Sequence, residues 1–199
     1  MQAVVMAAGE GRRMRPLSER WPKPVLPIDG RPVIASLLRE LVAGGFTEVT
    51  VVTGHLAEQV EELLGDGSAF GIAVRYARQP MPDGSADAVG RALEAGVRPP
   101  LVVSAADTLY SPGDVGRFVE AFARSGKPAA LAFVPDRRPA PLWGLTEAVT
   151  ALFHELSGPP FELLEAVRRA GEVARVEIGK TRGVTGPLDL VRENFPYLR

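Results

Sequence analysis

Near the amino terminus, Gly9, Gly11, Arg13 and Lys23 have the types and the spacing needed to hold a chain of phosphates. Glycines let a backbone pass close to a polyphosphate and turn its N–H groups toward it, while arginine and lysine supply fixed positive charge. A proline on each side of Lys23 places this lysine on a stiff segment. The arrangement predicts a binding loop for a nucleoside triphosphate.

This loop follows an apolar run over residues 3–8, whose length and lack of alternation are typical of a strand that is buried on both faces. A loop that leaves the carboxyl end of a parallel strand lies where open α/β sheets bind ligands. It is neither of the two commoner glycine loops, because one needs glycine at Met14 and the other needs Gly-Lys-Ser/Thr at residues 12–14. The residues of this loop that we predict to contact the nucleotide are Ala8, Gly9, Gly11 and Arg12.

Strand-like apolar runs alternate with amphipathic helical stretches along the chain. The runs typical of strands cover residues 3–8, 49–52, 72–76, 101–104, 129–134 and 173–178. Helical spacing covers residues 32–43, 57–64, 85–95, 115–124 and 161–170. This alternation predicts a three-layer α/β/α sandwich with a mostly parallel sheet. Polar signals follow the first four strands and are expected to meet at one sheet edge: residues 9–23, 54–55, 79–87 and Asp107.

No repeat or low-complexity tract divides the chain, and its 199 residues are predicted to form one domain. Residues 1–135 are expected to be its nucleotide-binding half and residues 136–199 its acceptor-binding half. Residues 137–141 contain two arginines and two prolines and are predicted to form an exposed connector between them.

The composition argues against several classes of protein. The absence of cysteine excludes disulfides, thiolate metal sites and thiol catalysis, and it is compatible with the cytoplasmic location that we expect. No apolar run suits a membrane span or a signal peptide, so we expect no membrane partner. A net charge of −1 and basic residues without interleaved aromatics argue against nucleic acid. We expect a monomer or a small homo-oligomer.

The string over residues 9–27 resembles the signature of the sugar-phosphate nucleotidyltransferases, the NDP-sugar pyrophosphorylases, which carry Gly-x-Gly-Thr-Arg-Leu-x-Pro-Leu-Thr followed by Pro-Lys-Pro. Arg12 and Met14 stand here at the threonine and leucine positions. Residues 84–88, Gly-Ser-Ala-Asp-Ala, are similar to the family's segment at the base and sugar, and Gln79 stands where a base-reading glutamine is common. The likeness covers roughly residues 2–135.

The resemblance implies a Rossmann-like, glycosyltransferase-A-like fold and a reaction in which an acceptor phosphate attacks the α-phosphorus of a nucleoside triphosphate. Arg13 and Lys23 would be the catalytic cations, and Asp107, at the family's metal-ligand position, would hold Mg²⁺. Such chemistry consists mostly of positioning and charge neutralisation. Further nucleotide contacts are expected at Gln79, Gly84 and Ser85. The Gln79 amide suits the edge of uracil or thymine, so we expect a pyrimidine triphosphate with a sugar phosphate as acceptor.

The carboxyl-terminal third departs from the family pattern. The Glu-Lys-Pro segment that helps to hold the sugar phosphate is missing, so the acceptor pocket is expected to use residues 141–144, residues 159–162 and the terminal helix. Gly183 occupies the position of the second metal aspartate. Either Glu177 or Asp189 replaces it, or Asp107 holds the metal alone, or catalytic power has been lost.

Alternative interpretations remain for individual residues. Arg12 and Arg15 also fit solvated loop charges, and Asp107 also fits a helix cap. Asp87 can instead be a first-turn acidic residue whose negative charge stabilises the start of a helix, and Gln79 can be an amide in a surface loop. His55 fits a loop residue without a function, while Trp143 and His154 are assigned to packing. For the whole chain, the alternatives are a non-catalytic nucleotide-binding or regulatory protein, or a cytidylyl- or molybdopterin-type transferase.

Overall fold

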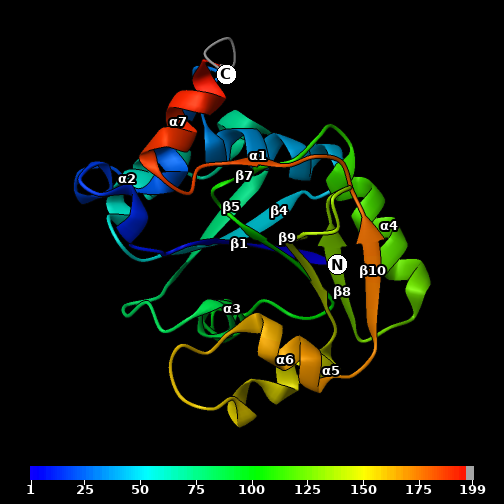
Figure 1. Ribbon diagram of the computed structural model, residues 1–199. Coiled ribbons are helices and arrows are strands. Elements are labelled where there is room, and N and C mark those ends of the chain that lie inside the picture. Colours follow the sequence, from blue (N-terminus) through cyan, green and yellow to red (C-terminus); the bar gives the residue numbers. More distant parts are fainter. Residues whose placement is uncertain (196–199) are drawn as a thin grey trace.

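The computed structural model describes residues 1–195, and a seven-stranded sheet forms its middle layer (Figure 1). The strands of this sheet are β1 (Gln2–Ala7), β4 (Glu48–Thr53), β5 (Ala73–Arg78), β6 (Leu101–Ala105), β8 (Ala129–Phe133), β9 (Pro139–Leu145) and β10 (Val173–Glu177). Their order in space is β10-β8-β9-β6-β1-β4-β5, and every neighbouring pair is parallel except the two that β9 forms. The carboxyl ends of the other six strands therefore share one edge.

Helices cover both faces of this sheet, which confirms the predicted three-layer sandwich (Figure 1). One face is covered by α1 (Val33–Ala43), α2 (Ala57–Leu64) and α4 (Asp114–Ser125), and the other by α3 (Ser85–Glu94), α5 (Glu147–Thr150) and α6 (Leu163–Arg169). Two short antiparallel pairs lie outside the sheet: β2 (Pro27–Ile28) with β3 (Arg31–Pro32), and β7 (Thr108–Leu109) with β11 (Arg182–Gly183). The last helix, α7 (Pro187–Asn194), packs against β2 and β11.

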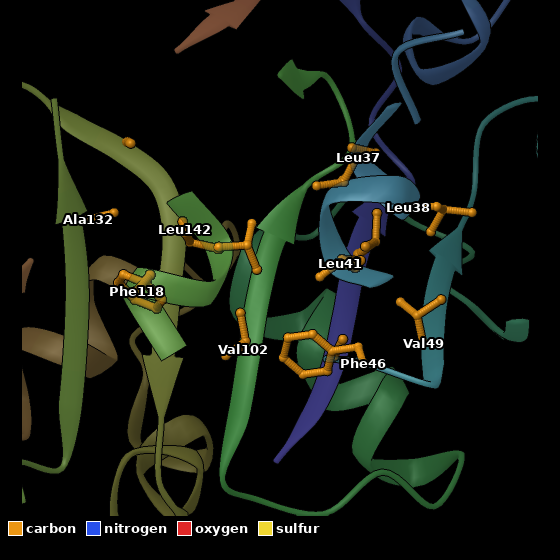
Figure 2. Close-up of a cluster of buried hydrophobic side chains, with 14 of the residues drawn as sticks. Leu37, Leu38, Leu41, Phe46, Val49, Val102, Phe118, Ala132 and Leu142 are labelled. Atoms are coloured by element: carbon orange, nitrogen blue, oxygen red, sulfur yellow. The ribbon is translucent and has the colours of Figure 1, made fainter. Parts of the chain in front are cut away.

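Strand side chains alternate between two hydrophobic cores. Val5 packs on the side of α1 and α4, whereas its neighbour Val4 packs on the side of α3 and α6. Figure 2 shows the first core, where leucines of α1 meet side chains of the sheet: Leu37, Leu38, Leu41, Val49 and Val102. Each fully buried aliphatic side chain contributes about 1.5–3 kcal/mol relative to exposure. Packing in the two cores therefore holds in position the carboxyl ends of the strands, which is where open α/β sheets bind their ligands.

The expected connector over residues 137–141 is confirmed only in its first part, because Arg137 and Arg138 form an exposed turn between β8 and β9. The rest is wrong, since β9 begins at Pro139 and Ala140 is buried. Prolines cannot donate to a strand ladder and normally lie at edges or irregularities. Here Pro139 and Pro141 precede Leu142, where pairing with β6 begins, and the pairing with β8 is irregular near Phe133. The two prolines, which lack a backbone N–H, therefore lie where β9 forms few hydrogen bonds with its neighbouring strands.

Two glycines predict opposite effects of an added methyl group. Gly90 lies inside α3, and a Cβ added there would meet no atom within 4 Å, so Gly90→Ala is expected to raise the free energy of unfolding by about 0.5–1 kcal/mol. A methyl group at Gly144 would overlap the ring of Phe122, so Gly144→Ala is expected to lower the free energy of unfolding by about 1–3 kcal/mol. Urea unfolding of both variants checks the pair, and equal effects would contradict this packing.

The two packing assignments have different outcomes. Trp143 packs against the second core, as predicted. His154 does not, because its side chain is 78% exposed. Within residues 1–195, no helix has both the length and the apolar character needed to cross a membrane.

Candidate active site

The glycine-rich loop leaves β1 and forms a short 3₁₀ turn at Arg12–Met14. Gly11 has a φ of +62°, and an added Cβ would lie 3.2 Å from both the Cγ of Lys23 and the Cβ of Ser18. Glycine is therefore required there by its conformation and by the close approach of Lys23. Met14 is completely buried and anchors the turn.

Lys23 and Asp107 meet at the edge of the sheet. The Nζ of Lys23 lies 3.3 Å from Oδ2 of Asp107, and their side chains are 13% and 31% exposed. They border a cavity of about 130 Å³ that is lined by Met6, Ala7, Gly9, Gly11, Lys23, Pro24, Ala105, Ala106 and Asp107. Because Met6 is paired with Ala105, this cavity lies at the adjoining carboxyl ends of β1 and β6.

Asp107 does not cap the helix that follows it. Helix α4 begins at Asp114, whose Oδ2 accepts a hydrogen bond of 3.1 Å from the backbone N–H of Ser111. Tyr110 fixes the intervening segment, since its hydroxyl donates to the carbonyl of Pro141 at 2.8 Å. Burial raises the pKa of Tyr110, which keeps this donor protonated. The Asp107 carboxylate is thus left to pair with Lys23.

The two predicted arginines of the loop differ in their surroundings. Arg12 is exposed and pairs with Glu10 at 2.7 Å, and this hydrogen bond lowers the pKa of Glu10. Arg13 is exposed, and its side chain has no hydrogen-bond or ion-pair partner within residues 1–195. Of these two cations, Arg13 is the one whose charge is available to an external anion.

Gln79 is buried, so its interpretation as a surface amide is wrong. Its Nε2 donates to the carbonyl of Gly84 at 2.9 Å and to Oδ2 of Asp87 at 2.8 Å. Asp87 also pairs with Arg91 at 3.1 Å. The amide nitrogen of Gln79 therefore holds the turn before α3, and its carbonyl oxygen is the polar atom left for a ligand.

Gly84 and Ser85 are held by the segment that precedes α6. Gly84 has a φ of +109°, and a Cβ there would overlap the backbone of Phe161. The N–H of Ala86 donates to the carbonyl of Phe161 at 2.8 Å. The Ser85 hydroxyl donates to Glu162 and accepts the Leu163 N–H at 2.8 Å. The predicted nucleotide contact at Ser85 would therefore use its backbone N–H, because its hydroxyl is already engaged. No sequence motif indicated the packing of this turn against residues 161–163.

His55 has a structural role that its sequence context did not suggest. Its Nε2 lies 2.7 Å from the carbonyl oxygen of Ser18, and its backbone N–H donates to the carbonyl of Ala8 at 3.2 Å. At the adjacent Gly54, a Cβ would lie 2.8 Å from atoms of Ala8 and 2.9 Å from the carbonyl oxygen of Gln79. The ends of β1, β4 and β5 therefore come into close contact here.

Gly183, which occupies the position of the family's second metal aspartate, lies beside Asp107. Gly183 is paired with Thr108, and a Cβ on it would lie 3.1 Å from the carbonyl oxygen of Asp107. Neither expected replacement fits. The Oδ2 of Asp189 accepts hydrogen bonds from two backbone N–H groups at the start of α7, and Glu177 lines a separate cavity. No cluster of three or more acidic, histidine or cysteine residues suits a metal ion within residues 1–195.

The segment that carries Gly183 is fastened to the β2–β3 turn. Arg182 lies 2.7 Å from Asp29 and 2.6 Å from Glu193. Its hydrogen bond lowers the pKa of Asp29, and the two acids raise the pKa of Arg182. The side chain of Asn194 donates to the carbonyl of Pro27 at 2.9 Å. These contacts set the position of Gly183 relative to Asp107.

The three segments that were expected to form the acceptor pocket do not come together in the structure. Residues 141–144 lie within β9, where Leu142 is fully buried. Residues 159–162 contact the turn at Gly84. Helix α7 packs on β2, at the other end of the molecule from α6 (Figure 1).

Residues 2–151 match the family model described as nucleotidyl transferase. An N-acetylmuramate alpha-1-phosphate uridylyltransferase of Neisseria meningitidis serogroup B is 42% identical over 108 residues, 52% of this chain and 46% of the relative. The low-salt glycan biosynthesis nucleotidyltransferase Agl11 of Haloferax volcanii is 31% identical over 169 residues, 82% of this chain and 47% of the relative. This chain thus spans less than half the length of these curated relatives.

A solved structure confirms the fold. It is described as a glucose-1-phosphate thymidylyltransferase from Bacillus anthracis in complex with sucrose. Its TM-score is 0.87 at 21% identity, and the match covers 98% of this chain and 94% of that one. The Rossmann-like sandwich is therefore shared over almost the whole of both chains.

Proposed function

The chain belongs to the nucleotidyl transferase family, and from this premise we propose that it transfers a nucleotidyl group from a nucleoside triphosphate to a sugar 1-phosphate. The observation that carries this proposal is the pair of Lys23 and Asp107, 3.3 Å apart. The pair borders a cavity that Gly9 and Gly11 also line. A cation, a carboxylate and a glycine loop at one sheet edge are the groups that this transfer needs.

In the proposed reaction, an oxygen of the acceptor phosphate forms a bond to the α-phosphorus while the bond to the bridging oxygen breaks and pyrophosphate leaves. No proton transfer is required. Lys23 lies in the cavity, where its charge reduces the repulsion between the α-phosphate and the acceptor phosphate. Arg13, which is free of internal partners among the described residues, holds the departing phosphates by paired hydrogen bonds.

We propose Asp107 as the residue that holds Mg²⁺. The donor set fits this ion, because Mg²⁺ is usually bound by one or two carboxylates, with water and substrate phosphates completing its ligands. When bound, the ion neutralises phosphate charge. Lys23 pairs with the Asp107 carboxylate and so offsets its negative charge before an ion binds. We also propose a cytoplasmic location and a monomer or small homo-oligomer, with the cysteine-free composition supporting the first.

The base preference is proposed from Gln79. Its amide nitrogen is engaged by Gly84 and Asp87, so its carbonyl oxygen can accept a hydrogen bond from a base. Uracil and thymine carry an N–H donor at N3, whereas cytosine does not. Uridylyl- and thymidylyltransferases among the similar proteins support the same choice.

We expect kcat/KM for UTP or dTTP to exceed that for CTP, ATP and GTP by about 10-fold or more. Pyrophosphate release, measured with these five triphosphates and a panel of sugar 1-phosphates in Mg²⁺, tests both the reaction and the base. A purine preference would overturn the base assignment. Absence of release with every combination would overturn the proposed reaction.

A further inference from the structure

A second cavity lies along the same sheet edge, at the carboxyl ends of β8 and β10. Its volume is about 580 Å³, and it is lined by Phe133, Val134, Pro135, Arg137, Arg175 and Glu177. Two of these residues are arginines, and Glu177 is its one acidic side chain, so the lining carries a net positive charge. We refer to it as the arginine cavity.

Arg175 is held in place by an aromatic ring. Its guanidinium carbon lies 3.9 Å from the centroid of the Phe133 ring, which is a cation–π contact. The guanidinium has no hydrogen-bond acceptor or acidic partner within residues 1–195. The contact thus holds the guanidinium against the ring while its N–H donors stay free of partners among the described residues. A guanidinium in this state is prepared to form paired hydrogen bonds with a carboxylate.

Arg137 projects from the turn between β8 and β9. It has a φ of +65°, which is unusual for a residue other than glycine and is maintained by its surroundings. The turn is closed by hydrogen bonds from Arg137 N–H to the carbonyl of Val134 at 2.8 Å and from Val134 N–H to the carbonyl of Arg138 at 3.0 Å. Arg138 pairs with Asp136 at 2.7 Å, whereas the Arg137 side chain has no partner among the described residues.

Three of the residues that line the arginine cavity lie on the same face of the sheet as part of the proposed active site. Ala132, Ala174 and Val176 pack with α4, so the alternating neighbours Phe133, Arg175 and Glu177 lie on the opposite face. Met6, which lines the Lys23 cavity, packs on that opposite face.

The strand order gives the span between the two sites. Strand β9 separates β6 from β8, so β8 lies roughly 10 Å and β10 roughly 14 Å from β6 at the usual strand spacing. The side chains of Arg137 and Arg175 are long enough to shorten this gap. An acceptor whose phosphate lies beside Lys23 can therefore direct its far end toward the arginine cavity.

We propose that the arginine cavity binds an acidic group of the acceptor, which makes the preferred acceptor a sugar 1-phosphate that carries a carboxylate away from its phosphate. This inference rests on the proposed nucleotidyl transfer for its reaction, but not for its binding site. Arg175 and Arg137 pair with the carboxylate, and Glu177 accepts hydrogen bonds from ring hydroxyls. The cavity thus supplies acceptor contacts in a chain that lacks the Glu-Lys-Pro segment.

Two matched pairs of sugar phosphates test the proposal by isothermal titration calorimetry. One pair is glucuronic acid 1-phosphate and glucose 1-phosphate, and the other is N-acetylmuramic acid 1-phosphate and N-acetylglucosamine 1-phosphate. We expect the acidic member of at least one pair to bind about 5- to 10-fold more tightly, with a preference that declines as salt is added. Arg175→Gln and Arg137→Gln are expected to reduce this ratio toward one, and Arg175→Lys to restore part of it.

Arg138→Gln is the matched control, because Arg138 belongs to the same turn but lies outside the lining of the arginine cavity. It is expected to leave the ratio unchanged. Equal affinity within both pairs, or a preference that survives both arginine substitutions, would overturn the proposal. If no acceptor is turned over but an acidic preference dependent on Arg175 remains, the proposed reaction fails while the binding site stands.

Discussion

Arg13→Ala and Lys23→Ala are each expected to lower kcat by about 10²–10³-fold, the scale of losing one preorganised charge that stabilises a transition state. Arg13 is exposed and has no side-chain partner within residues 1–195, so its removal should leave the free energy of unfolding almost unchanged. Lys23 is mostly buried and pairs with Asp107, so its removal also leaves a carboxylate without its cation. Rates of pyrophosphate release under saturating triphosphate and acceptor measure both effects.

Arg15→Ala is the matched control for this pair. Arg15 is another exposed arginine of the same loop, and neither it nor Arg13 lines the Lys23 cavity. The two differ in their place in the family signature, because Arg13 stands at its arginine and Arg15 at its variable position. Arg15→Ala is expected to change kcat by less than about 3-fold, because an exposed charge that does not contact the phosphates is largely screened by salt. Folded Arg13→Ala and Lys23→Ala proteins with full activity would show that this loop does not handle the phosphates of the reaction.

The meeting of Lys23 with Asp107 could be predicted from the sequence for a physical reason. Both follow apolar runs that are typical of buried parallel strands, and parallel strands bring their carboxyl ends to one edge. The sequence did not show that β1 and β6 are direct neighbours, because strand order depends on contacts between distant segments. Adjacency of these two strands is what brings the lysine within 3.3 Å of the carboxylate.

Residues 136–195 were harder to predict because local signals there disagree with tertiary structure. Prolines at 139 and 141 are typical of a loop, yet the flanking apolar residues place this segment between β6 and β8. Burial of Ala140 and Leu142 outweighs the weak local preference. The engagement of Ser85 by Glu162 likewise depends on a long-range contact that no short motif records.

The decisive prediction concerns the carboxylate at Asp107 and the absence of one at Gly183. Asp107→Asn keeps the size of the side chain but removes its charge, so we expect kcat to fall by about 10²–10³-fold and Mg²⁺ binding in the presence of nucleotide to weaken. Gly183 does not have a positive φ, and an added Cβ would meet the carbonyl oxygen of Asp107 at 3.1 Å. A side chain at Gly183 therefore requires only a small shift of its neighbour.

Gly183→Asp is expected to tighten Mg²⁺ binding by about 10-fold or more, because it adds a second carboxylate beside Asp107 at a position that now has no side chain. Gly183→Asn is the matched control, since it has the same size without the charge and should reproduce any cost of the tight contact but not the gain in affinity. Titration of Mg²⁺ with nucleotide present, followed by measurement of kcat for each variant, tests whether the chain is an enzyme or a non-catalytic nucleotide-binding protein.

If the wild-type protein binds nucleotide but releases no pyrophosphate with any acceptor, and Asp107→Asn leaves that binding unchanged in Mg²⁺, the protein is a nucleotide-binding regulator and not an enzyme. If Gly183→Asp instead raises a measurable wild-type rate, Asp107 alone already supports the reaction, and the glycine limits its speed by leaving the metal ion with one protein carboxylate.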